Sequence, residues 1–352
     1  MQEPKIIVGQ ELLKLITEID EFKGKWTLLK TMSPDRLSQL RKVATIESIG
    51  SSTRIEGAKL SDIQVETLLS NLTTTSFKNR DEQEVAGYAE AMDLVFQAFE
   101  DLRITENHIR QLHQTLLRHS DKDERHRGDY KTLPNHVVAK DQRGKEIGVV
   151  FETATPFDTP REMEELVKWA SKTMDEEAMH PLLIVAVFNV VFLAIHPFQD
   201  GNGRLSRILT TLMLLRMGYD YVPYASLEHV IEGNKELYYK ALRRTQTTLK
   251  SDKPDWEPWL GFFLRCLKKQ KANLEMKIQE HKPQDDSDLP ILSVQVLTLF
   301  IEHERLTIKE IVGLTGANQN TLKLRLRELV NGGFLKRHGK ARATWYSRSG
   351  RE

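Results

Sequence analysis

The most restrictive feature of the sequence is an uncharged apolar run, residues 182–195, that ends at a histidine followed directly by proline. The run is apolar on every side and too short to cross a bilayer, so it predicts a buried core helix. Pro197 disfavours right-handed helical geometry at His196, which places the end of the helix there. A second helical pattern, 204–217, stops at Gly218, a residue suited to the left-handed position after a helix. The sequence therefore predicts two packed helices joined by a short loop.

The loop between these helices combines groups that suit a polyphosphate. Residues 196–204 read HPFQDGNGR, and a second arginine follows at Arg207. We expect Gly201 and Gly203 to let successive backbone N–H groups turn inward as an anion-binding nest. The dipole of a helix that begins near Arg204 adds partial positive charge at the same point. The two arginines are three residues apart and project from one face of its first turn.

The stretch 196–207 resembles the signature of the Fic family of protein adenylyltransferases, HPFx(D/E)GNGRxxR, at every signature position. A plain glycine turn between helices, with Asp200 as a cap, predicts neither the His-Pro-Phe lead-in nor the complete spacing. The resemblance implies transfer of AMP from ATP to a Tyr, Thr or Ser hydroxyl of a target protein or of the protein itself. It makes His196 the general base and Asp200 the ligand of Mg²⁺, while Phe198 packs inward and fixes the loop. It assigns the phosphates of ATP to Gly201, Asn202, Gly203, Arg204 and Arg207.

Composition sets the outer limits of this interpretation. The chain has 352 residues, of which 39% are apolar and 29% charged, as in globular proteins with two or three domains. One cysteine, Cys266, excludes a disulfide framework and any site built from several cysteines. The N-terminus has no signal pattern, and no apolar run reaches the length of a membrane span, so we expect a cytoplasmic protein.

A second short pattern lies upstream, where residues 52–57 read STRIEG. By itself this is compatible with a short helix that has a serine cap and a glycine stop. It also matches the inhibitory motif of the Fic family, (S/T)xxxE(G/N), in the class whose inhibitory helix precedes the signature. The resemblance then implies that Ser52, Glu56 and Gly57 form this motif and that Glu56 restrains the enzyme by pairing with Arg207.

Residues 128–151 change character from helical to extended. Gly128-Asp-Tyr-Lys-Thr132 resembles the family's GxYR lead-in, with lysine in place of arginine. Two short strands follow around a polar turn at 141–144, and the second strand covers residues 147–151. A plain surface hairpin would have the same pattern. The resemblance makes it the flap that holds the target by strand addition, through residues of the first strand. These are Val137, Val138, Ala139 and Lys140.

Three residues in the later part of the chain and three histidines are candidates for binding roles. The resemblance places Tyr238 and Tyr239 against the nucleotide base and Gln246 where an asparagine is frequent, although tyrosines on helices more often lie in the core or at a rim. His108, His113 and His119 lack the compact spacing of metal ligands, which favours surface or helix-packing roles. Two departures from the family pattern, Asn189 and Leu193, concern helix packing rather than the reaction.

The C-terminal part has its own composition. From Pro290 to Glu352 the chain carries eleven Lys and Arg against five Asp and Glu, although the formal net charge of the whole protein is only +1. Two helices, a third from about Asn318 and a final hairpin resemble a winged helix-turn-helix. Asn320, Lys323 and Arg327 are left for solvent or DNA. Many winged helices bind proteins instead, so DNA, a protein partner and a homodimer all remain open.

These observations predict a mainly α protein. We expect a helical region at 1–100, a Fic-type catalytic core with its flap at 101–281, a linker at 282–290 and a winged helix (α+β) at 291–352. ATP is the expected substrate and Mg²⁺ the expected metal. Two alternatives remain: a transcriptional regulator that uses the pocket as a nucleotide sensor, and an enzyme that transfers or removes another phosphate-containing group.

Overall fold

The computed structural model describes residues 3–29, 34–71, 77, 79–135, 137–140, 146–280, 290–339 and 344–348. The chain divides into two compact units, Met1–Met276 and Lys277–Glu352, which we describe separately. The described residues are mostly helical with two small sheets, so the predicted mainly α class is confirmed. Among them, no helix combines the length and the apolar character needed to cross a membrane.

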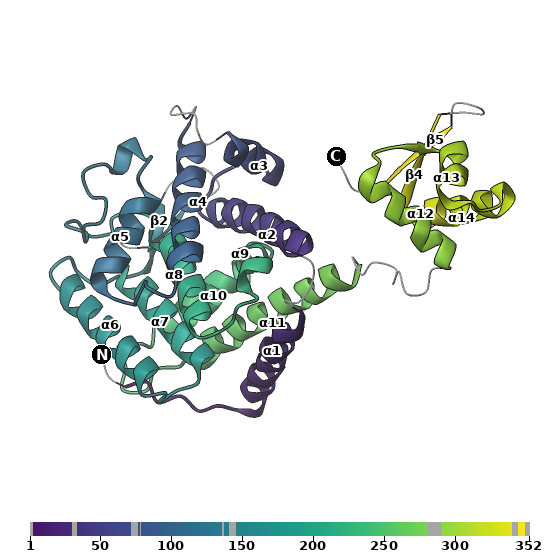
Figure 1. Ribbon diagram of the computed structural model, residues 1–352. Helices are drawn as coiled ribbons and strands as arrows, with labels where there is room; N and C mark the ends of the chain where they lie inside the picture. The colour runs from purple at the N-terminus through teal and green to yellow at the C-terminus, as the bar shows by residue number, and fades with distance from the viewer. Residues whose placement is uncertain are drawn as a thin grey trace. The chain divides into compact units, whose positions relative to one another are not determined.

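The first unit is built from helices (Figure 1). Their bounds are α1 Gln10–Leu29, α2 Pro34–Ile55, α3 Asp62–Ser70, α4 Arg80–Ala98, α5 Glu106–Leu116, α6 Thr159–Asp175, α7 Pro181–Ile195, α8 Asn202–Arg216, α9 Leu227–Glu232, α10 Lys235–Gln246 and α11 Glu257–Glu280. Two 3-10 turns, η1 Asp121–Asp123 and η2 Val222–Tyr224, connect some of them. α7 is the centre of this unit because nearly all its side chains are buried, and it packs against α6, α8 and α10.

The ends of α7 and α8 set the geometry of the loop between them. α7 ends at Ile195, as the sequence predicted, and His196 follows in the left-handed region with φ 53° and ψ 60°. Gly201 takes φ 80° immediately before α8. α8 begins at Asn202, so the predicted start at Arg204 is two residues late and Gly203 belongs to the first helical turn rather than to a separate turn.

The inhibitory-motif candidate lies at the end of a long helix. α2 runs without interruption to Ile55, and Gly57 follows with φ 108°. Residues 52–57 are therefore the last turn and the end of α2 rather than a short helix of their own.

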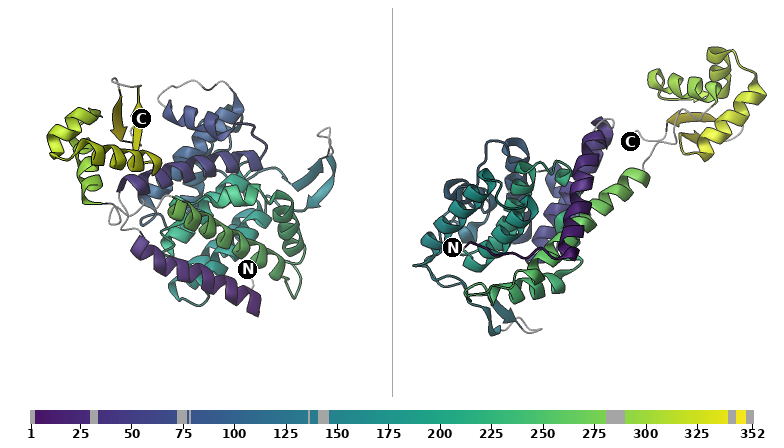
Figure 2. Two further views of the ribbon diagram at one scale, coloured as in Figure 1. Left: turned by 90° about the vertical axis from the view of Figure 1, so that its right-hand side faces the viewer. Right: turned by 90° about the horizontal axis from the view of Figure 1, so that it is seen from below.

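A hairpin interrupts the helices of the first unit. β1 Val137–Lys140 and β2 Glu146–Phe151 pair antiparallel, and Val138 lies opposite Val149. Figure 2 shows the hairpin projecting from the helical body. The predicted turn at 141–144 and the side chains of β1 lie outside the described part of the chain.

The second unit combines helices with a small three-stranded antiparallel sheet. Its elements are α12 Ile291–Glu302, β3 Leu306–Thr307, α13 Ile308–Thr315, α14 Gln319–Asn331, β4 Leu335–His338 and β5 Trp345–Arg348. The sheet order is β3-β5-β4, with antiparallel pairs. A capping box between Thr307 and Glu310 begins α13, and Leu322, Leu326 and Leu329 of α14 face the core. Of the predicted linker 282–290, only Pro290 is described.

Candidate active site

His196 lies at the C-terminal end of α7 with one ring nitrogen fixed. Its Nδ1 is 3.3 Å from the carbonyl oxygen of Leu193, which can only accept, so Nδ1 carries the hydrogen. Nε2 is then the unprotonated nitrogen of the neutral ring. Burial lowers the pKa of His196 to about 4, and the nearby Lys131 ammonium acts in the same direction. The imidazole is therefore neutral at physiological pH and able to accept a proton through Nε2.

The loop after His196 is held by hydrogen bonds to its main chain. The Asn202 side chain accepts from the Phe198 N–H at 2.9 Å and donates to the Phe198 carbonyl oxygen at 2.6 Å. The Phe198 ring is fully buried and stacks on His113 of α5, with ring centroids 3.8 Å apart. The prediction that Phe198 packs inward is confirmed.

His113 is a residue whose contribution to the loop the sequence did not reveal. Its Nδ1 accepts from the Gly128 N–H at 2.9 Å, so its Nε2 donates to the Asp200 carbonyl oxygen at 3.0 Å. Burial lowers its pKa to about 4, which keeps the ring neutral. His113 thus ties the signature loop to the segment before the hairpin. Its spacing to other histidines carries no hint of this, because both of its partners come from distant segments.

Asp200 lies at the solvent side of the site among basic groups. Its carboxylate lies 3.3 Å from both Arg204 and Arg80, and 3.7 Å from Lys122. Burial raises its pKa, but Arg204, the Gly201 N–H and the other cations more than offset this, so the pKa lies below its ordinary value. Asp200 is therefore ionised at neutral pH. Among the described residues, no cluster of three His, Cys, Asp or Glu side chains forms a metal site.

Arg204 is buried at the start of α8 and faces two carboxylates. Its Nη1 lies 3.2 Å from Glu84 of α4, and its Nη2 lies 3.3 Å from Asp200. Glu84 is itself buried and also accepts from Arg80 at 2.7 Å. Within the described residues, Nε and Nη1 of Arg204 are buried without a well-formed hydrogen bond. An anion with several oxygens would satisfy such donors.

Arg207 is paired with the end of α2. Its Nη2 donates to Glu56 Oε1 at 2.8 Å, and its Nε donates to the Ser52 hydroxyl at 2.8 Å. Burial raises the pKa of Glu56, but Arg207 more than offsets it, so the pKa is lowered and Glu56 is ionised. Gly203 allows this arrangement because a Cβ at its position would collide with the Glu56 carboxylate. Nη1 of Arg207 is another buried donor with no acceptor in the described chain.

The expected base-binding residues occupy α10. Tyr238 is buried beside Arg207, and burial raises its pKa to about 12. Tyr239 is 43% exposed, and its ring centroid lies 5.0 Å from that of Tyr238. Gln246 is buried at the far end of the helix. Tyr239 is thus the member of this set that a ligand could reach.

The two departures from the family pattern lie in helix contacts. Asn189 donates to the Thr210 hydroxyl at 2.8 Å and to the Ser206 carbonyl oxygen at 3.3 Å, joining α7 to α8. Leu193 is buried.

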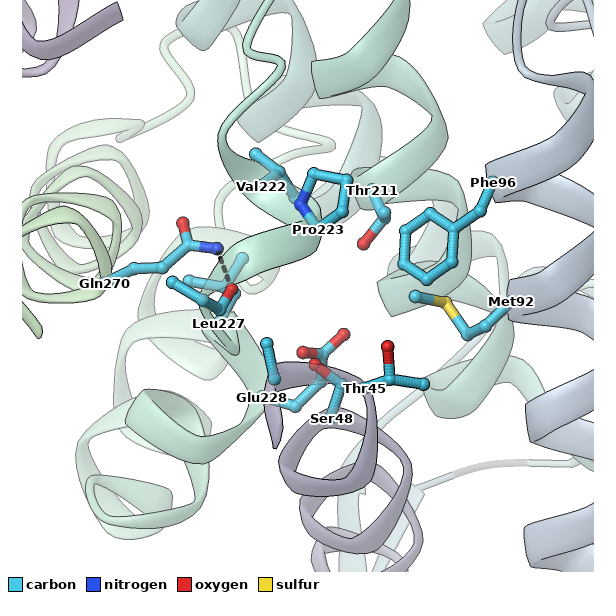
Figure 3. A pocket seen from close by; sticks show the side chains of 12 residues that line it. Thr45, Ser48, Met92, Phe96, Thr211, Val222, Pro223, Leu227, Glu228 and Gln270 are labelled. Carbon is cyan, nitrogen blue, oxygen red and sulfur yellow. Dashed lines mark hydrogen bonds between the residues drawn. The ribbon is translucent and has the colours of Figure 1, made fainter. Parts of the chain in front are cut away.

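A small cavity lies elsewhere in the first unit. Side chains of α2, α4 and α8 line it together with Glu228 and Gln270 (Figure 3). Its volume of about 10 Å³ suits at most one water molecule. Gln270 donates to the Ala225 carbonyl oxygen at 2.7 Å there. The cavity shares no residue with the signature loop and is far too small for a nucleotide.

Residues 103–214 match the Fic/DOC family model. The curated "Protein adenylyltransferase Fic" of Drosophila persimilis is 26% identical over 239 residues, which cover 67% of this chain and 42% of that protein. This chain therefore spans less than half the length of that curated relative.

Solved structures share the fold. A Fic family protein from Desulfovibrio desulfuricans G20 superposes with a TM-score of 0.67 at 24% identity and covers 99% of both chains. A Fic domain containing signaling protein from Bacteroides thetaiotaomicron gives 0.62 at 24% identity, covering 75% of this chain and 98% of its own. Residues 103–214 are thus the part of this chain that is similar to the Fic/DOC family.

Proposed function

We propose that this protein is an adenylyltransferase that transfers AMP from ATP to a Tyr, Thr or Ser hydroxyl of a target protein and of itself. The observation that carries the proposal is the position of a neutral His196 beside two buried arginines whose donors are incompletely satisfied. A base and an anion-binding surface next to each other suit attack by a hydroxyl on a phosphate. The name of the curated relatives, protein adenylyltransferase, supports the same chemistry.

In this mechanism His196 Nε2 takes the proton of the target hydroxyl. The hydroxyl oxygen forms a bond to the α-phosphorus in line with the bond to the β-phosphate oxygen. That second bond breaks, AMP becomes esterified to the target, and pyrophosphate leaves with the electron pair. Nδ1–H, fixed on Leu193, keeps Nε2 available throughout.

The phosphates of ATP would occupy the start of α8. The N–H groups of Asn202 and Gly203 lie at the positive end of the helix dipole, where developing negative charge is stabilised. Arg204 and Arg207 would hold the β- and γ-phosphates, because a planar guanidinium matches phosphate oxygens. Tyr238, Tyr239 and Gln246 of α10 are the proposed base-binding residues. The first strand of the hairpin, 137–140, would pair with the target main chain.

The residues present fit one magnesium ion delivered with ATP. Mg²⁺ characteristically uses one or two carboxylates together with substrate phosphates, and Asp200 is an ionised carboxylate at the edge of the anion-binding surface. Asp200 would hold the ion, whose chemical contribution is to neutralise phosphate charge. The present neighbours of Asp200, which include the exposed Arg80 and Lys122, would have to give way.

Glu56 would act as an inhibitor of this reaction. Its carboxylate occupies the Arg207 guanidinium that the γ-phosphate needs, and both partners are anions. ATP that binds without Arg207 would place its α-phosphorus out of line with the hydroxyl. Ser52 and Gly57 support this state, Ser52 by accepting from Arg207 and Gly57 by allowing the chain to leave α2.

The proposed function is tested by incubating the full chain with ATP labelled either at the α- or at the γ-phosphorus, alone and with cell lysate. Label retained only from the α-position supports AMP transfer. Label retained only from the γ-position would assign transfer of a phosphoryl group instead. Tight ATP binding without covalent label from either ATP would favour the nucleotide-sensing regulator. Loss of AMP from a pre-labelled target would show that the protein removes AMP.

The second unit would contribute partner binding. Buried leucines fix one face of α14, and Asn320, Lys323 and Arg327 lie exposed on the rest of it. We propose that this helix enters a DNA groove, with the basic side chains contacting phosphates. Fluorescence anisotropy with duplex DNA should show binding that weakens with salt and is lost in Lys323→Glu/Arg327→Glu. If the protein does not bind DNA but dimerises as its concentration rises, or captures a protein partner, the second unit serves protein contacts instead.

We also propose a cytoplasmic location, because the single thiol of Cys266 is buried and suits a reducing compartment. Fractionation of cells with an antibody against the chain tests this.

A further inference from the structure

The main chain of the signature loop is anchored by two residues that precede the hairpin. The Ile195 carbonyl oxygen accepts from Lys131 Nζ at 2.9 Å, and the Pro197 carbonyl oxygen accepts from the Lys131 backbone N–H at 2.8 Å. The carbonyl oxygens of His196 and Phe198 accept from the side-chain amide of Asn135, at 3.2 Å and 2.6 Å. Four consecutive carbonyl groups, from Ile195 to Phe198, thus accept hydrogen bonds from Lys131 or Asn135.

The Lys131 ammonium also reaches both ends of the hairpin. Besides Ile195, it donates to the side-chain oxygen of Asn135 at 2.8 Å and to the Thr153 hydroxyl at 3.0 Å. Asn135 lies just before β1 and Thr153 just after β2. All three ammonium protons have an acceptor, and the side chain is almost entirely buried. The Lys131 ammonium therefore links the end of α7 to the residues that flank both strands of the proposed flap.

His196 requires such support because its backbone is strained. A residue other than glycine at φ 53° costs on the order of 1–3 kcal/mol and persists only where its surroundings fix it. The last carbonyls of α7 have no partners within the helix, and a cation at a helix C-terminus is favoured by the dipole. Lys131 supplies both the hydrogen bond and the charge at this point.

We propose that Lys131 is a positioning residue for His196: it holds the catalytic histidine in its left-handed conformation and couples it to the hairpin that would receive the target. This inference rests on the proposed function, in which His196 is the base. Positioning His196 in this way requires a hydrogen-bond donor with positive charge at position 131. The Fic pattern noted above has arginine there, which meets the same requirement.

The charge of Lys131 has a second, measurable effect. It adds to burial in lowering the pKa of His196, whereas Glu56 and Asp200 act in the opposite direction. Burial lowers the pKa of Lys131 itself to about 8, with Glu162 as the charged neighbour that opposes this, so the ammonium is mostly charged at neutral pH. Removing the charge should therefore raise the pKa of His196.

The experiment compares Lys131→Met, Lys131→Arg and the control Lys23→Met in the full chain. Lys23 is a matched control because its Nζ also caps a helix end, donating to the Met217 carbonyl oxygen after α8 at 2.8 Å. Initial rates of AMP transfer at varied ATP separate kcat from KM. Folding is checked by circular dichroism and thermal unfolding. Proton–carbon NMR of the histidine rings, with His196 assigned by its absence in His196→Ala, gives its pKa without any need for turnover.

We expect Lys131→Met to lower kcat about 10- to 100-fold with KM for ATP within about twofold of wild type, because small displacements of a catalytic group cost this much. The pKa of His196 should rise in the same variant. Lys131→Arg should restore most of kcat and the wild-type pKa, and Lys23→Met should leave both unchanged. Equal kcat losses in Lys131→Met and Lys23→Met, an unchanged kcat in Lys131→Met, or failure of arginine to restore it would overturn the proposal.

If Lys131→Met does not fold, Asn135→Ala replaces it. This side chain is only partly buried, yet its loss removes two of the four carbonyl bonds. A folded Asn135→Ala protein should lose about tenfold in kcat, and an unchanged kcat would contradict the anchoring of His196. If wild type transfers no AMP, the adenylyltransferase proposal fails, but the NMR titration of His196 still tests the role of Lys131.

Discussion

The two halves of the candidate active site are held in different ways. The loop half, residues 195–200, is fixed by neutral hydrogen bonds and one ammonium on main-chain carbonyls. The arginine half, Arg204 and Arg207 on α8, is held by the carboxylates of Glu84, Asp200 and Glu56.

This difference separates contacts that a bound nucleotide would leave in place from contacts that it would displace. The ionised phosphates of a nucleotide carry only acceptors, so they cannot replace a lysine or an amide on the carbonyls of the loop. The phosphates do compete with carboxylates for guanidinium groups, because both are anions. In the proposed function, the loop half is preorganised for proton transfer, and the arginine half is occupied by internal anions until phosphates displace them. The following predictions test the two halves separately.

The largest effect is expected in the loop half. His196→Ala removes the proton acceptor, so AMP transfer should fall by about 10²–10⁴-fold while ATP binding persists. Transfer is measured with α-labelled ATP, and binding by calorimetry. Near-normal labelling, or lost ATP binding in a folded variant, would show that the role of His196 is misassigned.

The second effect concerns the arginine half. Glu56→Gly frees Arg207 and should raise the rate of self-labelling about ten- to a hundredfold, which is the equivalent of one charge-assisted hydrogen bond. Glu56→Gly/His196→Ala should abolish it. The initial rates of self-labelling at saturating ATP are compared among wild type and these variants. Glu11→Gly, which removes an exposed glutamate on α1, is the control. Equal rates in wild type and Glu56→Gly would remove the inhibitory role and leave the transferase proposal intact.

The third effect is on stability and again concerns the loop half. His113 has a folded-state pKa of about 4, below its ordinary 6.5, so the unfolded chain binds more protons between these values. Its contribution to stability is complete above pH 6.5 and is lost as the pH falls towards 4. Burial is the main cause of this lowered pKa; Arg204 and His126 act in the same direction, and the Asp200 carbonyl oxygen and Asp123 act in the opposite direction.

From pH 7 to pH 5 this group should cost at most about 2 kcal/mol of unfolding free energy. His113→Gln should reduce the pH dependence by that amount, as measured by urea unfolding at both pH values. Replacing the partly exposed His108, whose Nδ1 contacts the Arg103 carbonyl oxygen, should not. An unchanged dependence in His113→Gln would mean that this ring is not kept neutral by the fold.

The smallest effect is expected from removing the second unit. A protein ending at Lys282 keeps both halves of the site and should retain transfer within about twofold, because compact units with their own cores fold separately. Circular dichroism and labelling of the shortened chain measure this. A folded but inactive shortened chain would make residues beyond 282 part of the catalytic unit.

The sequence by itself determined the features that depend on neighbouring residues. The apolar run and Pro197 place the end of α7 at His196, and the glycines and arginines that follow define the chemistry of the loop. In the structure Thr105 and Thr307 cap α5 and α13, each by accepting from the backbone N–H three residues on. The end of α7 was predictable because proline restriction and helical periodicity act within a few residues, as capping does.

Only the tertiary structure decided which groups hold the site in place. Glu84 and His113 come from α4 and α5, Lys131 and Asn135 from the segment before the hairpin, and none of them belongs to a pattern that identifies its partner. Ser52 bonds to Arg207 across 155 positions of the sequence, and Lys131 bonds to Ile195 across 64. The strain at His196 was hidden as well, since proline excludes the right-handed helix there but does not select the left-handed conformation. Buried hydrogen bonds and ion pairs need exact distances between distant segments, and packing of the whole helical unit sets those distances.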